Sequence, residues 1–322
     1  MSKVLILGAT GTLGRSLTRQ AIAAHHEVTV VVRTPSRLLP STREQVTVHQ
    51  ADLASVPRSA LATMLRDQDV VINTAGRVTD GQGFVDLFGR IVTVLESLPQ
   101  ADRPVCWFLA GAALLDLDDR GRRGIDLPRV AATYWPHRAN FNRLHRSALD
   151  WRLLCPGPLV PQQALGLARM RITLDRVPVE LPSFTRSLPG ALVLPFFIRR
   201  VPEMIVPYAD AAALILANLT PSGGMSHRRV GLALPLGMRG EKPQWAGAPG
   251  AARAPRRLAP AGADPRRRGR VRRPRATDGR ARLLAGARPG RRRGTGGHLE
   301  PGAQLGHGCT AGGRWRGAGQ PA

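Results

Sequence analysis

The sequence predicts an α/β protein built on a doubly wound parallel sheet. Short apolar runs alternate with helix-like stretches over residues 3–109, and three glycines follow the first apolar run. The runs are apolar at successive positions rather than at every second one, which is typical of strands that helices bury on both faces. We expect one such domain over residues 1–244.

The first half of this domain alternates regularly between strands and helices. In the first helix, leucine and alanine recur at helical spacing at Leu13, Leu17, Ala21 and Ala24. The predicted strands are Lys3–Leu7, Glu27–Val32, Val46–His49, Asp69–Asn73 and Val105–Leu109, and the predicted helices are Thr12–Ala24, Pro57–Arg66 and Phe84–Leu98.

The second half is less regular. We expect a helix to start at Pro136, because proline is tolerated in the first turn of a helix but not inside one. The elements predicted after it are the strand Trp151–Cys155, the strand Ile172–Leu174, the helix Tyr208–Leu219 and the strand Val230–Ala233. The segment 156–207 between them is expected to form the substrate side of the domain.

The turn after the first strand carries a phosphate-binding pattern, GATGTLG. Gly8 allows a sharp turn, Gly11 lets the backbone approach a pyrophosphate, and Gly14 lets the following helix pack closely on the sheet. The helix N-terminus then offers free N–H groups to the phosphates. We therefore predict a Rossmann-type dinucleotide site whose further members are Thr10, Thr12 and Leu13; a tight turn without a ligand is the alternative.

The end of the second strand indicates which dinucleotide is preferred. An NAD site usually has an acidic residue there, which binds the ribose 2′-hydroxyl. Here Arg33 holds that position, followed by Thr34, Ser36 and Arg37. A guanidinium pairs with a 2′-phosphate, so NADP(H) is preferred, while NAD(H) remains possible.

These motifs together resemble the short-chain dehydrogenase/reductase superfamily. The match is to its atypical NAD(P)H-binding branch, which is NAD(P)-dependent epimerase/dehydratase-like, and it rests on GATGTLG, VVVR, ADL (51–53) and NTAG (73–76). The resemblance implies that Asp52 and Leu53 lie by the adenine and that Ala75 and Gly76 lie against the adenosine ribose. It also implies that the chain passes the nicotinamide at Pro156.

The catalytic pattern of that superfamily, Tyr-x-x-x-Lys, is not complete in this chain. Tyr134 has the spacing, but Arg138 stands where lysine is expected, and arginine stays protonated and relays no proton. With the helix starting at Pro136, the two side chains would not share one helical face. His137 is the better proton-donor candidate, because its unperturbed pKa lies near neutrality. A solvent-facing histidine at a helix start is the alternative.

The segment Pro136–Val160 resembles the same atypical branch, and the helix position of His137 with the later strand Ile172–Leu174 also resembles, in part, biliverdin-IXβ reductase/flavin reductase. That resemblance implies an oxidoreductase that places a small, quinone- or flavin-like substrate over the nicotinamide. The phenylalanines Phe184, Phe196 and Phe197 are candidates for an aromatic pocket, or else for core or interface. The alternative function is a non-catalytic, NADP-sensing regulator. The expected partner is a small-molecule substrate, and the chain is expected to be a monomer or homodimer.

Residues 245–322 differ sharply in composition from the rest. They hold 18 arginines, no lysine and three acidic residues, and they carry more than half of the net charge of +25. Without apolar periodicity, this tail is expected to be disordered. A basic arm for nucleic acid is one interpretation of PRRRGRVRRPR (265–275). Arginine, glycine, alanine and proline are also the residues that GC-rich codons specify, so we favour a frameshifted or read-through end and expect no specific nucleic-acid partner.

Cysteine usage and hydropathy limit the remaining possibilities. The three cysteines are far apart and match no metal-ligand spacing, so no metal site is expected. The sequence shows no secretory signal pattern and no run of the ~20 apolar residues that span a bilayer. We expect a cytoplasmic protein that makes no membrane contact.

Overall fold

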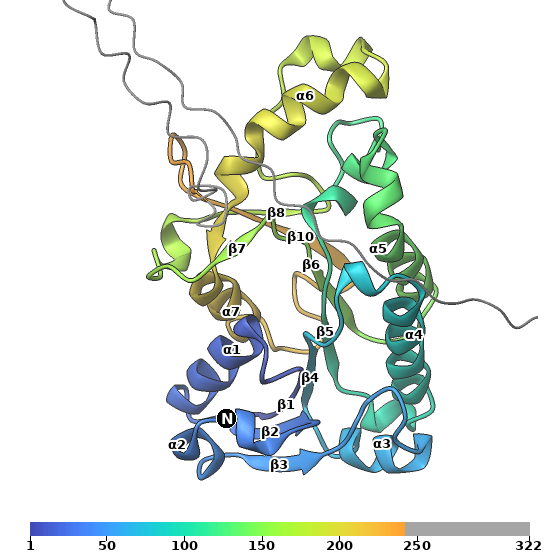
Figure 1. Cartoon of the computed structure of the whole chain (residues 1–322), viewed down its shortest axis with the longest axis vertical. Helices are drawn as coiled ribbons and strands as arrows, with labels where there is room; N and C mark the ends of the chain where they lie inside the picture. The colour runs from blue at the N-terminus through green and yellow to red at the C-terminus, as the bar shows by residue number, and fades with distance from the viewer. Residues whose placement is uncertain (242–322) are drawn as a thin grey trace, which may run out of the picture. The chain divides into compact units, whose positions relative to one another are not determined.

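The computed structural model describes residues 1–241, and its centre is one twisted sheet (Figure 1). The predicted boundary at 244 and the arginine-rich tail lie outside the described residues. The strands of the sheet follow the order β3 (Thr47–Gln50), β2 (Glu27–Val32), β1 (Lys3–Leu7), β4 (Val70–Asn73), β5 (Val105–Leu109), β6 (Trp151–Leu154), β10 (Arg228–Ala233) and β8 (Arg171–Leu174). All neighbours pair in parallel except β10 and β8. The predicted doubly wound α/β class is confirmed.

Helices cover both faces of the sheet. They are α1 (Thr12–Ala23), α2 (Pro40–Arg43), α3 (Arg58–Leu65), α4 (Gln82–Glu96), α5 (Val130–His145), α6 (Gly190–Arg200) and α7 (Tyr208–Leu216). The side chains of β1 alternate between the two faces: Val4 and Ile6 pack with α1 and α7, whereas Leu5 and Leu7 pack with α3, α4 and α5. Figure 1 shows these two groups of helices on opposite sides of the strands.

The start of α5 corrects the sequence-based expectation. The helix begins at Val130, so Pro136 lies inside it rather than in its first turn, and Tyr134 and Arg138 are one turn apart. An internal proline lacks the N–H that would bond the carbonyl four residues earlier, which costs about 3 kcal/mol in a helix interior. Tertiary contacts offset this loss, because Arg138 donates 2.8 Å hydrogen bonds to the Ile125 carbonyl and to the Asp126 carboxylate.

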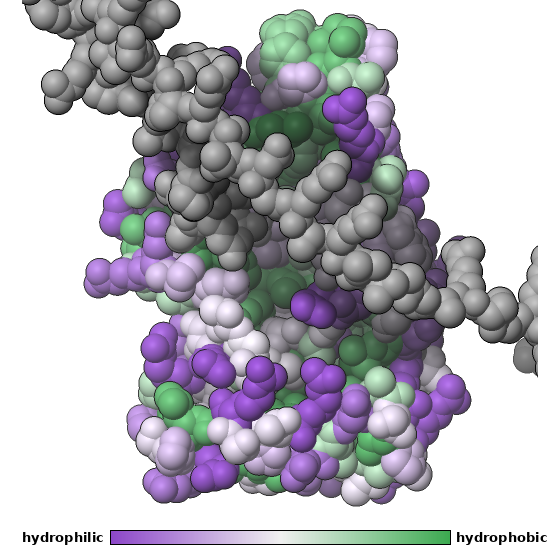
Figure 2. All heavy atoms as spheres, viewed as in Figure 1, coloured by the Kyte–Doolittle hydropathy of each residue, from purple (hydrophilic) through white to green (hydrophobic). Residues whose placement is uncertain are grey.

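Apart from β8, which joins the main sheet, the segment 156–207 forms a small outer lobe. It contains a two-stranded parallel ladder of β7 (Leu159–Val160) and β9 (Val206–Pro207), and α6 carries Pro195 within it. Phe197 is buried, whereas Phe184 and Phe196 pack edge to face near the surface, 5.2 Å between ring centres. Figure 2 shows apolar residues gathered at the end of the domain that α6 forms.

The turn between β1 and α1 is the tightest backbone packing at the carboxyl edge of the sheet. Gly8 has φ +85°, a conformation that favours glycine. A Cβ at Gly14 would lie 2.2 Å from the Gly8 carbonyl oxygen and 2.7 Å from the Ala9 Cα. The first turn of α1 therefore sits directly on the preceding loop, at a distance that only glycine permits.

We expect Gly14→Ala to lower the free energy of unfolding by about 2–3 kcal/mol, because the new methyl group forces backbone apart. Gly89→Ala is the matched control: Gly89 lies within α4, where an added Cβ meets no atom within 4 Å. That change should raise stability by about 1 kcal/mol through helix propensity. Urea denaturation of both variants measures the difference, and equal effects would contradict the packing argument.

Candidate active site

The predicted cofactor residues converge on one edge of the sheet. The loop Gly8–Gly14 follows β1, Arg33 follows β2, Asp52–Leu53 follow β3, Ala75–Gly76 follow β4, and Pro156 follows β6. These strands are parallel, so their carboxyl ends lie along the same edge, where open α/β sheets bind their ligands. The fold thus brings together segments that are up to 148 residues apart in the sequence.

The N-terminus of α1 has the features of an anion site. Gly11 is the N-cap residue and has no side chain to cap the helix, and no acidic residue lies in the first turn. Gly11 and Thr12 are exposed, Thr10 is half-buried, and Leu13 is buried in the core. The free N–H groups and the positive end of the helix dipole therefore face the carboxyl edge, which suits a pyrophosphate.

The end of β2 is positively charged. Arg33 and Arg37 are exposed, and Arg15 of α1 reaches the carbonyl of Arg37, 3.4 Å away. Among residues 1–241, none of these three guanidinium groups has a carboxylate within 4 Å. An unpaired cluster of guanidinium groups suits a phosphate on the ribose.

The loops after β3 and β4 differ in what they offer a cofactor. Asp52 is exposed, and its carboxylate accepts a 3.0 Å hydrogen bond from the Ala54 N–H. Leu53 is 8% exposed and belongs to the core, so its backbone rather than its side chain is available. Gly76 has φ +95°, and a Cβ there would lie 2.4 Å from the Phe84 ring. The loop after β4 therefore lies closely against Phe84.

A cavity of about 180 Å³ opens between the ends of β4 and β5 and the helix α5. Its lining is mostly apolar or uncharged: Asn73, Thr74, Ala75, Gly76, Val78, Phe84, Leu109, Ala110 and His137. Of the two candidate catalytic residues, His137 lines it directly. Tyr134 stacks on the His137 ring, 6.1 Å between centres, and Phe84 meets the same ring edge to face at 5.7 Å.

His137 is buried rather than solvent-facing. It is 9% exposed, and its Nδ1 atom has no hydrogen-bond partner among the described residues. Its Nε2 lies on the Gly111 side of the ring, 3.6 Å from where a Cβ at Gly111 would be. Burial lowers the His137 pKa to about 4, so the imidazole is neutral at pH 7. A neutral imidazole donates one hydrogen bond and accepts another.

Asn140 lies one turn after His137 on α5 and is 4% exposed. Neither its Oδ1 nor its Nδ2 has a partner within the described part of the chain. Buried polar groups without partners are rare, and they concentrate at functional sites. The buried face of α5 therefore carries polar atoms of His137 and Asn140 that no group in the described residues satisfies.

Tyr134 and Arg138 share a helix but form no catalytic pair in this structure. Arg138 instead donates hydrogen bonds to the Ile125 carbonyl and to the Asp126 carboxylate, both in the segment that precedes α5. Tyr134 is 38% exposed. Pro156 is buried, and its carbonyl accepts a 2.8 Å hydrogen bond from the Ala112 N–H, which joins the loops after β5 and β6.

Sequence reasoning missed Phe84 and Val78 as cavity residues. Phe84 was assigned only to a helix, and nothing in its local pattern shows that it faces His137. The three phenylalanines of the outer lobe line neither this cavity nor the one beside α1 described below. Residues 1–241 contain no group of three metal-binding side chains, and no helix in that range is long and apolar enough to cross a bilayer.

The burial of His137 predicts a pH-dependent stability. Between the folded pKa of about 4 and the unfolded value near 6.5, the unfolded chain binds a proton that the folded chain excludes. The free energy of unfolding therefore falls as the pH drops through this range, by about 2 kcal/mol between pH 7.5 and 5. His137→Gln should remove this part of the dependence, while the exposed His25→Asn should keep it. Denaturation at several pH values measures both slopes, and identical slopes in the two variants would refute the shift.

Comparison with known proteins agrees with this geometry. A family model described as NAD(P)H-binding matches residues 8–177. A comparison of the sequence with curated proteins found no match. Three similar solved structures show the same fold at low identity.

The first is a putative epimerase from Bacteroides thetaiotaomicron, 20% identical, with a TM-score of 0.55, covering 73% of this chain and 98% of its own. The second is a putative NADH-flavin reductase from Streptococcus pneumoniae, 17% identical, with a TM-score of 0.53, covering 73% and 100%. The third is a protein from Lactobacillus casei, 21% identical, with a TM-score of 0.53, covering 72% and 99%. Because the family model spans more than half of the chain and ends beyond β6, this protein belongs to the NAD(P)H-binding family.

Proposed function

We propose that this protein is an NADPH-dependent oxidoreductase that reduces a small quinone- or flavin-like compound. The observation that carries the proposal is the cavity at the carboxyl edge, where a buried, neutral His137 lies beside the loop that follows β4. The neighbour described as a putative NADH-flavin reductase makes such a substrate plausible for this fold. The required partner is a small molecule.

The residues present fit a nicotinamide dinucleotide. Gly8 and Gly14 allow the close turn, and the uncapped N-terminus of α1 would hold the pyrophosphate. Arg33 would pair with the 2′-phosphate, which favours NADPH over NADH. Asp52, Ala75, Gly76 and Pro156 are proposed to border the rest of the cofactor, in the order in which their strands follow one another across the sheet.

The bound cofactor would supply a hydride to the substrate. The chain's own part is to exclude water and to hold the substrate oxygen. His137, neutral at pH 7, would donate a hydrogen bond to that oxygen and so stabilise the negative charge that develops on it. The proton that completes the reduction would come from water or from the half-exposed Tyr134, because a histidine with a pKa of about 4 is a weak proton carrier at neutral pH.

The size of the cavity limits what enters it. About 180 Å³ lies below the ~300–1,000 Å³ of typical small-molecule sites. The cavity would therefore take the reacting end of a substrate, such as one carbonyl-bearing ring. The remainder of a larger substrate would lie outside it, toward the outer lobe.

A non-catalytic NADP-sensing regulator is the second candidate function. The observation that favours it is the engagement of Arg138 with Asp126 and Ile125, which keeps this cation in a structural contact instead of leaving it for the Tyr134 hydroxyl. A sensor needs the cofactor-binding edge and no acid or base in the cavity.

Arg33→Gln should weaken NADPH binding by roughly tenfold, because a charged hydrogen bond to a phosphate is worth ~1.5 kcal/mol or more. NADH binding should not change. Arg43→Gln is the matched control, since Arg43 is also exposed and lies in α2. Fluorescence titration of both nucleotides measures the effect. An equal loss for NADPH and NADH would exclude a contact with the 2′-phosphate.

Turnover separates the two candidate functions. We expect wild-type protein to oxidise NADPH in the presence of simple quinones or free flavins, and His137→Gln to lower kcat by about a hundredfold, as loss of one oxyanion donor does. NADPH affinity should stay within about twofold, and His25→Asn should behave as wild type. Tight NADPH binding without turnover of any compound in the panel would favour the sensor.

A further inference from the structure

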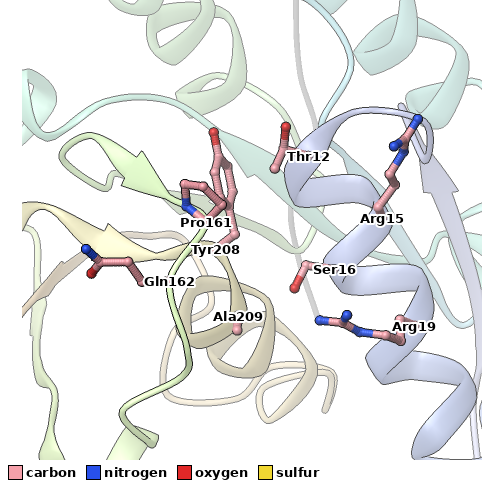
Figure 3. A pocket seen from close by; sticks show the side chains of 8 residues that line it. All are labelled: Thr12, Arg15, Ser16, Arg19, Pro161, Gln162, Tyr208 and Ala209. Carbon is pink, nitrogen blue, oxygen red and sulfur yellow. The ribbon is translucent and has the colours of Figure 1, made fainter. Parts of the chain in front are cut away.

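A second cavity, of about 320 Å³, lies along the side of α1, on the face of the sheet opposite α5. Three distant segments line it: Thr12, Arg15, Ser16 and Arg19 from α1, Pro161 and Gln162 from the loop after β7, and Tyr208 and Ala209 from the start of α7 (Figure 3). It reaches two turns along α1, so its inner end lies about 10 Å from the helix N-terminus at 1.5 Å per residue. It is therefore larger than a cofactor pyrophosphate site at Gly11 would need.

The polar groups of this cavity are mainly hydrogen-bond donors. Figure 3 shows the hydroxyls of Thr12 and Tyr208 at one rim and the guanidinium of Arg19 extending below Ser16 toward α7. No acidic residue lines the cavity. Within residues 1–241, Arg19 has no carboxylate partner, and the hydroxyls of Thr12 and Tyr208 make no hydrogen bond to protein. Several unpaired donors around one cation suit a ligand with several acceptor oxygens.

The walls of the cavity are fixed independently of any ligand. Gln20 joins α1 to α7 through a 2.9 Å hydrogen bond to the Ala209 carbonyl. The buried Asp210 carboxylate accepts hydrogen bonds of 2.8–3.2 Å from the Leu165 and Gly166 N–H groups, which holds the loop that carries Gln162. A site whose walls are held in this way needs little reorganisation to bind.

We propose that this cavity binds the phosphate group of a small molecule, at a site separate from that of the cofactor. Arg19 provides the charge, and the hydroxyls of Ser16, Thr12 and Tyr208 provide hydrogen bonds to the phosphate oxygens. A tetrahedral phosphate matches donors arriving from two helices better than a planar carboxylate does. The proposal does not depend on the oxidoreductase activity.

An arginine outside the cavity makes the matched control on the full-length chain. Arg43 is exposed, lies in α2 and does not border the cavity. Arg19→Gln and Arg43→Gln remove the same charge, so the non-specific attraction of phosphate to the rest of the chain changes equally in both. Binding of inorganic phosphate at constant ionic strength, measured by calorimetry, should be about tenfold weaker in Arg19→Gln and unchanged in Arg43→Gln.

Further measurements distinguish this site from the cofactor site. Tyr208→Phe, which removes one hydroxyl, should weaken phosphate binding severalfold, and acetate should bind more weakly than phosphate to the wild-type chain. With saturating NADPH present, phosphate should still bind. Equal losses in Arg43→Gln and Arg19→Gln, equal binding of acetate, or displacement of phosphate by NADPH would each overturn the proposal. If the chain failed to bind NADPH, the proposed function would be refuted. The difference in phosphate binding between the two arginine variants would still test the phosphate site.

Discussion

The contact on which the carboxyl edge depends is the approach of the first turn of α1 to the Gly8 carbonyl. The Gly8 carbonyl accepts a 2.9 Å hydrogen bond from the Gly11 N–H, and it leaves no room for a side chain at Gly14. This contact sets where α1 begins and aims its free N–H groups along the edge of the sheet. The contact also helps to set the position of α1 against α7. The second cavity lies between the side of α1 and the start of α7. A displacement of the first turn would therefore disturb both candidate sites.

The helix α5 carries several features that are locally unfavourable. This helix contains an internal proline, and its buried face holds His137 and Asn140, whose side-chain atoms lack partners in the described chain. Each of these features is unfavourable by itself. Of these residues, His137 lines the cavity that the proposed function requires, whereas the hydrophobic clusters on both sides of the sheet show close apolar packing. Folded proteins depart from local rules mainly where ligands bind, and α5 fits that pattern.

The sheet was predictable from sequence because its signals are local. Continuous apolar runs and the glycine turn placed β1, β2 and β5 with the bounds that the structure has. Local rules failed where long-range contacts decide. The rule for Pro136 started α5 six residues too late, because the bonds from Arg138 to residues 125 and 126 cannot be read from neighbouring residues. The pairing of Phe84 with His137 and the meeting of Tyr208 with α1 likewise depend on packing between elements more than 50 residues apart. The predicted cofactor residues were placed together because parallel strands all end at one edge.

The distribution of ion pairs shows how the charge of this domain is divided. Every ion pair in the described residues uses an arginine between Arg77 and Arg229, and several of these pairs join the loops and strands around β6, β8 and β10. The seven arginines of residues 1–66 have no carboxylate partner within 4 Å in the described chain. The acidic side chains after residue 76 thus pair with arginines of the same part of the chain. The arginines that follow β2 and lie along α1 keep their positive charge without a carboxylate partner in the described residues. Because an unpaired guanidinium gains most from a phosphate oxygen, we expect anionic ligands to bind in the half of the domain that carries the glycine turn.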